Sequence, residues 1–256
     1  MKKTTYLTQI LAVIFITMGI VMLSSCKQKE ANTKTQNNSN QPFIKDLSAT
    51  EFKKQISSDD AIILDVRTPE EVAQGHIEGS SNINYYDENF KEKINLINKE
   101  KAICVYCKSG GRSALAAKIL AKNGFNRIYQ LNGGTIAWEE SNFPLTKATV
   151  TADEHIKTMT LEEFNTLLQS DKPVLVDFHT VWCAPCRKMV PIVDEIEKEY
   201  KDKAIVLRID ADKSKEIAKA YNIKGVPVFM LFKNGKQQWK HKGIIAKEEL
   251  VKQIRN

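Results

Sequence analysis

Short apolar segments alternate with helical segments through most of the chain, and this alternation restricts the fold more than any other feature. In the first half the strand-like segments are AIILDV, KAICVYC and NRIYQL. Helical segments lie between them, and one, at residues 113–123, is followed by Gly124, a residue typical of the turn after a helix. Short buried strands that alternate with helices form parallel sheets covered on both faces, so this half is predicted to be a parallel-sheet α/β domain.

A second set of strand and helix signals occupies the rest of the chain. Its strand-like segments are PVLVDFHT, AIVLRID, VPVFMLF and KQQWKHK, and only the turn residues KNG separate the last two. That turn predicts an antiparallel hairpin, so the sheet of this α/β domain is expected to be mixed. A chain of 256 residues has room for two domains. We expect them at residues 43–147 and 156–256, joined by a linker at 148–155.

The N-terminus has the order of a secretory signal, with early lysines, an apolar run at residues 10–23 and then small residues. The sequence LSSC at 23–26 resembles the bacterial lipobox, in which the cysteine is acylated and becomes the first residue. We therefore expect a signal peptide at 1–25, a lipid on Cys26 and a flexible polar tether at 26–42. An uncleaved anchor or plain secretion is the alternative.

This N-terminus predicts a lipid-anchored protein of the cell envelope that faces the periplasm. Lys27 follows the lipidated cysteine, where aspartate is associated with retention in the inner membrane. The lysine therefore favours the outer membrane.

The charge pattern and the positions of the cysteines and histidines argue against nucleic-acid-binding and metal-binding functions. The net charge of +7 comes from lysines scattered along the chain, with no basic run interleaved with aromatics. A solvated surface is therefore expected, and no binding of nucleic acid. The two C-x-x-C pairs, at 104–107 and 183–186, are too far apart for a zinc ribbon, and the four histidines are isolated. No metal and no cofactor are predicted.

The pair Cys183 and Cys186 lies where an apolar strand passes into a long helix. A cysteine at a helix N-terminus faces unpaired backbone N–H groups and the positive end of the helix dipole, and both favour the thiolate. Cys183 is therefore the expected nucleophile, and Cys186, one turn later, is placed to resolve a mixed disulfide. We expect Trp182 to shield the pair and Pro185 to stiffen the spacer.

The segments PVLVDFHTVWCAPCRKMVPIVDEI and IKGVPVFMLFKNGK resemble thioredoxin, and the resemblance covers about residues 156–256. It implies a thioredoxin fold and a redox-active Cys183–Cys186 disulfide. It also implies a cis Pro227 that presents backbone to an extended substrate, and a buried Asp177 that shuttles the proton of the resolving cysteine. The alternatives are that Asp177 is only structural and that Pro227 only begins a strand.

Three positions depart from the thioredoxin pattern. The spacer is Ala184-Pro185 where Gly-Pro is most common, and His179 stands where an aromatic is common. Val206 stands where a lysine often partners the buried acid. These positions are near the dithiol, so whether the domain reduces, oxidises or isomerises disulfides stays open.

Another candidate nucleophile, Cys107, ends a strand-like segment and begins the stretch of residues 107–112, here called the Cys107 loop. Gly110 and Gly111 permit positive φ values, so the loop can turn its backbone N–H groups inward as an anion-binding nest at a helix N-terminus. Lys108 and Arg112 add positive charge. Such a loop would stabilise a thiolate and an anionic sulfur donor.

The segments LDVRTPEEVAQGHIEGSSNI, VYCKSGGRSALAAKIL and YQLNGGTIAW together resemble a rhodanese domain over about residues 43–146. The resemblance implies that Cys107 takes sulfane sulfur from thiosulfate or a related donor and passes it to a thiol or cyanide. The residues implied to bind the donor are Lys108, Ser109, Gly110, Gly111 and Arg112. Related phosphatases have one more residue in this loop, so its length here favours sulfur chemistry. Asp65 and Arg67 would support the loop or form only a structural salt bridge.

Cys104 shares the C-x-x-C spacing with Cys107 but lies within the strand-like segment. Alternation along a strand places the two side chains on opposite faces, so a second dithiol is not expected. Cys104 is predicted to be a buried free thiol. The alternative is a resolving partner that guards Cys107.

Together the two domains predict an extracytoplasmic enzyme of thiol redox and sulfur transfer, in which the Cys183/Cys186 dithiol reduces the Cys107 persulfide. The expected partners are a sulfane-sulfur donor such as thiosulfate, exported proteins or small thiols and disulfides, and the membrane through the lipid on Cys26. An external reductant system would restore the dithiol. The alternative is a thioredoxin-type protein disulfide oxidoreductase whose rhodanese domain chiefly binds a partner.

Overall fold

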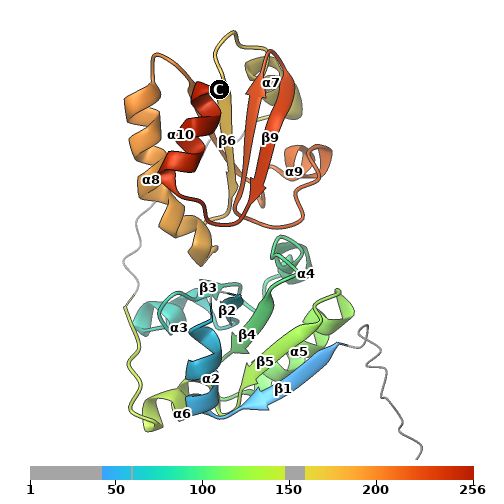
Figure 1. Ribbon diagram of the computed structural model, residues 1–256. Helices are drawn as coiled ribbons and strands as arrows, with labels where there is room; N and C mark the ends of the chain where they lie inside the picture. The colour runs from blue at the N-terminus through green and yellow to red at the C-terminus, as the bar shows by residue number, and fades with distance from the viewer. Residues whose placement is uncertain (1–41, 59, 148–158) are drawn as a thin grey trace, which may run out of the picture. The chain divides into compact units, whose positions relative to one another are not determined.

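The computed structural model describes residues 42–58, 60–147 and 159–256, and these form two α/β domains (Figure 1). The predicted signal peptide, the lipid site at Cys26, the tether up to residue 41 and the linker at 148–155 lie outside the described residues. Within the described ranges, no helix combines the length and the apolarity needed to cross a membrane.

The first domain is built on a parallel five-stranded sheet, as the alternation predicts. Its strand order is β1-β5-β4-β2-β3, and all neighbouring strands are parallel. The strands are β1 (Phe43–Leu47), β2 (Ala61–Asp65), β3 (Ser81–Asn82), β4 (Ala102–Tyr106) and β5 (Arg127–Leu131). The helices are α2 (Ala49–Ile56), α3 (Pro69–Gln74), α4 (Phe90–Ile94), α5 (Gly111–Lys122) and α6 (Gly134–Glu140).

Strand β4, in the middle of this sheet, sends alternate side chains into two cores. Cys104 packs with Phe52 of α2 and Trp138 of α6 in one core. Val105 and Cys107 belong to the other core, which α5 covers. The two cysteines therefore lie on opposite faces of the sheet, as predicted, and both are free thiols.

The second domain has a mixed four-stranded sheet in the order β7-β6-β8-β9. Strand β6 pairs parallel with β7 and antiparallel with β8, and β8 and β9 form the predicted hairpin. The strands are β6 (Val174–His179), β7 (Ile205–Asp210), β8 (Val228–Lys233) and β9 (Lys236–Lys242). The helices are α7 (Leu161–Leu167), α8 (Ala184–Tyr200), α9 (Lys215–Ala220) and α10 (Lys247–Arg255).

Alternation along β6 assigns its residues to the two faces of this sheet. Leu175 packs with residues of α8 and α10, whereas Val176 and Phe178 pack on the opposite face with residues of α7 and α9. Asp177 and His179 have the same parity as Leu175, so they lie on the face that α8 covers. The position of these two polar side chains on the α8 side follows from the strand alone.

Side-chain caps begin several of the helices. Capping boxes are present at the starts of α2 and α7. A third box joins Thr68 and Glu71 at the start of α3. Glu71 Oε2 accepts the Thr68 N–H at 3.0 Å, and the Glu71 N–H donates to Thr68 Oγ1 at 3.4 Å. This box fixes the Glu71 carboxylate at one end of the first domain's sheet.

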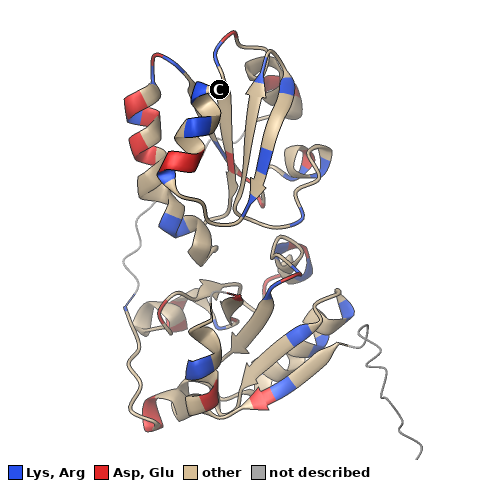
Figure 2. Cartoon of the chain, viewed as in Figure 1, with Lys and Arg blue, Asp and Glu red and all other residues tan. Residues whose placement is uncertain are grey.

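Basic and acidic residues are interspersed on both domains (Figure 2). Lys and Arg occur on helices such as α2 and α8 and on strands such as β5 and β9. The lysines and arginines are therefore scattered over the described helices and strands, as they are along the sequence.

Candidate functional site

The dithiol of the second domain lies at the start of α8. Cys183 is the N-cap residue, and its Sγ accepts the backbone N–H of Cys186 at 3.1 Å. The two cysteines form a disulfide with an S–S distance of 2.08 Å and a Cα–Cα distance of 5.2 Å. Once the disulfide is reduced, the same N–H group and the helix dipole stabilise a thiolate on Cys183. This geometry suits thiol–disulfide exchange.

The peptide bond between Val226 and Pro227 is cis, as the resemblance implies. Pro227 directly precedes β8, and its carbonyl oxygen accepts the Gly243 N–H at 2.8 Å.

Trp182, the residue before Cys183, is bonded to an acid that follows β7. Its Nε1–H donates to Asp212 Oδ2 at 3.4 Å. That bond anchors the indole next to the dithiol in the chain.

The buried acid Asp177 lies on β6, on the sheet face that α8 covers, and is 3 % exposed. Its register partner on β7 is Arg208, whereas Val206 is the partner of Leu175. Val206, which stands where the thioredoxin pattern often has a lysine, is thus in register with Leu175 and not with Asp177. The chain has a basic residue on the strand beside Asp177, and it is an arginine.

Arg208 links β7 to helix α8. Its Nη2 donates to the Val190 carbonyl at 2.9 Å and lies 3.0 Å from Asp194 Oδ1. The arginine side chain is buried, while that of Asp194 is half exposed. The face of the sheet under α8 therefore holds a permanent cation in register with Asp177.

The Cys107 loop forms the centre of the first domain's site. Its sulfur accepts the backbone N–H of Gly110 at 3.2 Å. Ser113 Oγ lies 3.5 Å from the same sulfur and 2.9 Å from the Gly110 carbonyl oxygen, so its single proton serves one acceptor at a time. Gly110 has the positive φ expected of this loop, 96°, whereas the φ of Gly111 is not positive. The loop leads directly into α5, as predicted.

The two free cysteines of this domain differ in acidity. Burial by itself raises the pKa of Cys107, but hydrogen bonds from Ser113 and from the backbone N–H groups of Ser109 and Gly110 outweigh it, so the pKa is lowered. Burial without such donors raises the pKa of Cys104 to about 12. Of these two cysteines, Cys107 therefore has the greater thiolate character.

We expect Ser113→Ala to raise the pKa of Cys107, because it removes a donor that stabilises the thiolate. Below that pKa the thiolate fraction falls, so alkylation by iodoacetamide at pH 7 should slow several-fold. The pH profile of the alkylation rate, measured with the Cys183–Cys186 disulfide intact, should move to higher pH. Ser141→Ala, at the end of α6, is the matched control. An unchanged pH profile in the Ser113 variant would show that the backbone N–H donors alone are enough to lower the pKa of Cys107.

Carbonyl groups of the Cys107 loop are held from outside the loop. The Cys107 carbonyl accepts the Thr135 N–H at 2.9 Å, and the Lys108 carbonyl accepts the Ile136 N–H at 3.1 Å. From β5, Gln130 Nε2 donates to the Gly110 carbonyl at 3.0 Å. Because these carbonyls bond outward, the loop N–H groups are left to face the sulfur.

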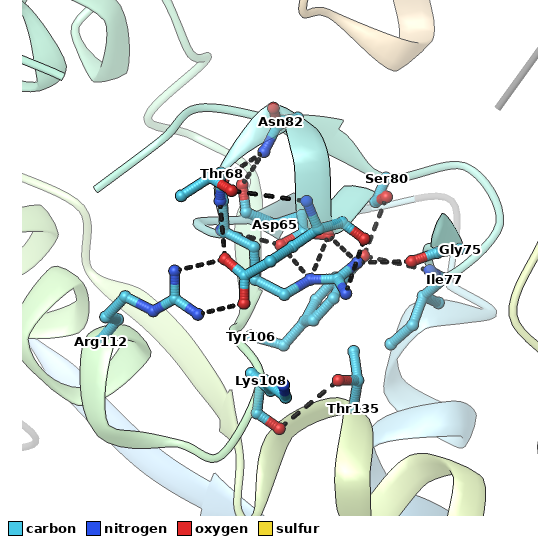
Figure 3. A network of polar contacts seen from close by, with 12 residues as sticks. Asp65, Thr68, Gly75, Ile77, Ser80, Asn82, Tyr106, Lys108, Arg112 and Thr135 are labelled. Carbon is cyan, nitrogen blue, oxygen red and sulfur yellow. Dashed lines mark hydrogen bonds and ion pairs between the residues drawn. The ribbon is translucent and has the colours of Figure 1, made fainter. Parts of the chain in front are cut away.

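Arg112 is paired with an acid of α3. Its Nη1 and Nη2 each lie 2.7 Å from one carboxylate oxygen of Glu71, and dashed lines in Figure 3 mark these bonds. The sequence predicts Arg112 as a contact for the donor anion. The structure places its guanidinium on Glu71, a residue that the sequence did not single out for this site. Lys108 is exposed at the same loop.

Asp65 and Arg67 form a buried ion pair. Asp65 is labelled in the polar network of Figure 3. Arg67 Nη2 lies 2.6 Å from Asp65 Oδ2 and donates to the Gly75 carbonyl at 2.7 Å. The Tyr106 hydroxyl accepts the Ile77 N–H at 3.0 Å and donates to Ser80 Oγ at 3.1 Å. These bonds join the ends of β2, β4 and α3, and so support the chain that carries Glu71.

Four residues that were not predicted as site residues contact the Cys107 loop: Glu71, Ser113, Gln130 and Thr135. All four lie within the segments that carry the rhodanese resemblance. Ser113 directly follows the loop, whereas the other three contact it from distant parts of the sequence, which a single sequence does not display. The predicted members of the loop, by contrast, are contiguous.

Comparison with known proteins divides the chain in the same way. A family model described as thioredoxin matches residues 155–256, and one described as a rhodanese-like domain matches residues 48–141. Thioredoxin Y2, chloroplastic, from Arabidopsis thaliana is 45% identical over 101 residues, which cover 39% of this chain and 60% of that protein. The chain thus spans less than two thirds of the length of this relative.

Thioredoxin from Rickettsia bellii is 44% identical over 90 residues, which cover 35% of this chain and 86% of that protein. Among solved structures, oxidised mitochondrial thioredoxin 3 from Saccharomyces cerevisiae has 30% identity, with 39% of this chain and 92% of that chain covered and a TM-score of 0.36. The sequence similarity to these relatives concerns the second domain.

Proposed function

Because the chain belongs to the thioredoxin family, through a domain that follows a rhodanese-like domain, we propose that it couples thiol–disulfide exchange to sulfur transfer. The thiol redox activity rests on the Cys183–Cys186 disulfide at the N-terminus of α8. In the reduced protein, Cys183 attacks a substrate disulfide and forms a mixed disulfide. Cys186 then attacks the Cys183 sulfur and releases the substrate as a thiol.

Asp177 and Pro227 are proposed to assist this exchange. Asp177 is buried on the face that α8 covers, where it can take the proton of the Cys186 thiol as that residue becomes the attacking group. Pro227, after a cis bond, presents backbone to the substrate.

Sulfur transfer is proposed to take place on Cys107. The observation that carries this proposal is the set of donors on its sulfur, the Gly110 N–H at 3.2 Å and the Ser113 hydroxyl at 3.5 Å. The thiolate attacks the outer sulfur of a sulfane donor, a new S–S bond forms, and the donor's old S–S bond breaks. With thiosulfate the leaving group is sulfite, which takes the electron pair of the broken bond. Lys108, Ser109, Gly110 and Gly111 are the proposed binding residues of the donor.

The two activities are proposed to form one cycle. Cys183 attacks the outer sulfur of the Cys107 persulfide and becomes the persulfide itself, which returns the Cys107 thiolate. Cys186 then attacks the Cys183 sulfur, sulfide leaves as HS⁻, and the Cys183–Cys186 disulfide forms. The dithiol has lost two electrons to the sulfane sulfur, so an external dithiol reductant must restore it.

The setting of this cycle is proposed from the N-terminal sequence. Acylation of Cys26 would hold the two domains at the surface of the cell envelope, facing the periplasm, with the outer membrane favoured by Lys27. Exported proteins and small thiols or disulfides are then the proposed substrates of the dithiol.

We expect Cys183→Ser to abolish the release of sulfide from the sulfane donor while cyanide-dependent transfer continues. The reason is that cyanide takes sulfur directly from Cys107, whereas sulfide release needs the dithiol. The measurement is sulfide and thiocyanate production by the full reduced chain, with Cys104→Ser as the control for loss of an unrelated cysteine. Undiminished sulfide release from the Cys183 variant would contradict the cycle.

Mass spectrometry tests the first step by itself. After incubation with thiosulfate or cysteine persulfide, the peptide that contains Cys107 should gain one sulfur atom, and the Cys107→Ser variant should gain none there. If Cys107 gains no sulfur from either donor, the rhodanese-like domain is a binding module and sulfur transfer is excluded.

A further inference from the structure

The charge of the Cys107 loop is smaller than its sequence suggests. Arg112 and Glu71 form two parallel hydrogen bonds of 2.7 Å, and their side chains are only 18% and 24% exposed. A two-point pair of this kind is among the stronger and more directional ion pairs in proteins. The positive charge of the guanidinium is therefore compensated where a donor anion would meet it.

Glu71 is itself held in place, so the pair is not a chance contact of two mobile side chains. The carboxylate accepts the Thr68 N–H at 3.0 Å in the capping box of α3. The bonds from Arg112 hold the pKa of Glu71 down to about 2, so the carboxylate stays ionised through the physiological range. Acidification within that range does not release Arg112.

The groups left for an anion are the loop N–H groups and the exposed Lys108. Around them lie apolar surfaces. Tyr86 is 66% exposed, and the Arg112 guanidinium carbon lies 5.8 Å from the centre of its ring. Ile136, whose N–H bonds the Lys108 carbonyl, is 44% exposed. An inorganic anion makes no use of such side chains, whereas the carbon skeleton of an organic thiol can pack on them.

We propose that the preferred sulfur donor of the Cys107 loop is an organic persulfide, and that Glu71 determines this preference by compensating Arg112 against dianions such as thiosulfate. This inference rests on the proposed sulfur transfer to Cys107. Glu71 acts through Arg112, so it is a positioning residue for specificity. Tyr86 and Ile136 supply the contact surface for the organic group.

The transfer step is balanced without an added redox partner. The Cys107 thiolate attacks the outer sulfur of R–S–SH, and the bond between the two donor sulfurs breaks. The electron pair of that bond leaves with the thiolate R–S⁻, which takes a proton from water. The enzyme persulfide releases its own proton to water and is held as an anion by the loop N–H groups.

The experiment compares loading of Cys107 in the reduced full chain by thiosulfate and by cysteine persulfide, from which kcat and KM are obtained with cyanide as the acceptor. For the unaltered protein we expect kcat/KM for cysteine persulfide to exceed that for thiosulfate by about tenfold or more. Glu71→Gln keeps an acceptor for Thr68 but frees the charge of Arg112. It should raise kcat/KM for thiosulfate about tenfold, through a lower KM, and change that for cysteine persulfide less than about threefold.

Two further variants separate specificity from folding. Glu71→Gln/Arg112→Gln should lose the gain with thiosulfate, because the freed charge is gone. Glu70→Gln changes an exposed carboxylate in the same helical turn and should alter neither donor. A preference of the unaltered protein for thiosulfate, or an equal change for both donors in Glu71→Gln, would overturn the inference. Failure of both donors to load Cys107 would instead overturn the proposed function on which it rests.

Discussion

Replacement of Gly134 by alanine should disrupt the Cys107 loop and prevent sulfur loading of Cys107. A Cβ at this position would lie 2.3 Å from the Cys107 carbonyl oxygen and 2.5 Å from the Lys108 carbonyl carbon, both of them backbone atoms. Gly134 also has a φ of 61°, which an alanine adopts only with strain. The α6 N–H groups would be pushed off the loop carbonyls, at a cost of about 2–4 kcal/mol in unfolding free energy.

Gly111→Ala is the matched control for this prediction. Gly111 lies in the same site, but a Cβ there would meet nothing within 4 Å, and its φ is not positive. As the first residue of α5, it should tolerate alanine with a change below about 1 kcal/mol. Urea unfolding and mass spectrometry of Cys107 after incubation with a sulfane donor measure both effects. Equal behaviour of the two variants would show that the close approach of α6 to the loop does not matter.

Replacement of Arg67 by methionine should destabilise the first domain by about 3–5 kcal/mol, because it leaves the Asp65 carboxylate buried without its cation. The two side chains are 6% and 0% exposed, and their closest atoms are 2.6 Å apart. The variant also removes the donor that Arg67 Nη2 provides to the Gly75 carbonyl. The end of α3, and with it Glu71, should loosen before the rest of the domain unfolds.

The chain provides a control with the same pair of residue types at the same distance. Arg127 lies 2.6 Å from Asp60, but these side chains are 47% and 48% exposed. Arg127→Met should therefore cost about 0–1 kcal/mol. Urea unfolding compares the variants in a Trp182→Phe/Trp239→Phe background, where the fluorescence comes from Trp138 in the core of this domain. Similar losses in both would contradict the assignment of the effect to burial.

Much of the architecture follows from local patterns in the sequence. The alternation of apolar strands and helices predicts both sheets, and the turn residues KNG predict the hairpin of β8 and β9. Strand β1 is the exception. Four of its five residues are exposed at the sheet edge, so it lacks the apolar run that makes the other strands recognisable. Its partner β5 supplies the hydrogen bonds that make it a strand.

The register of the strands in the second domain is a feature that the sequence leaves open. The departure from the thioredoxin pattern at Val206 does not reveal which residue of β7 lies beside Asp177, and the strand pairing puts Arg208 there. Positions 206 and 208 point to the same face of a strand, so periodicity cannot choose between them. Only the alignment of β6 with β7 makes that choice.

By itself the sequence determined the two folds and the contiguous parts of each site, the Cys183–Cys186 pair at a helix start and the loop that begins at Cys107. It also placed Cys104 and Cys107 on opposite faces, because strand alternation is a local property. Only the tertiary structure decided that Arg112 is paired with Glu71, which is 41 residues away along the chain. Both residues lie near the starts of their helices, α3 and α5, and only tertiary packing brings these two starts together.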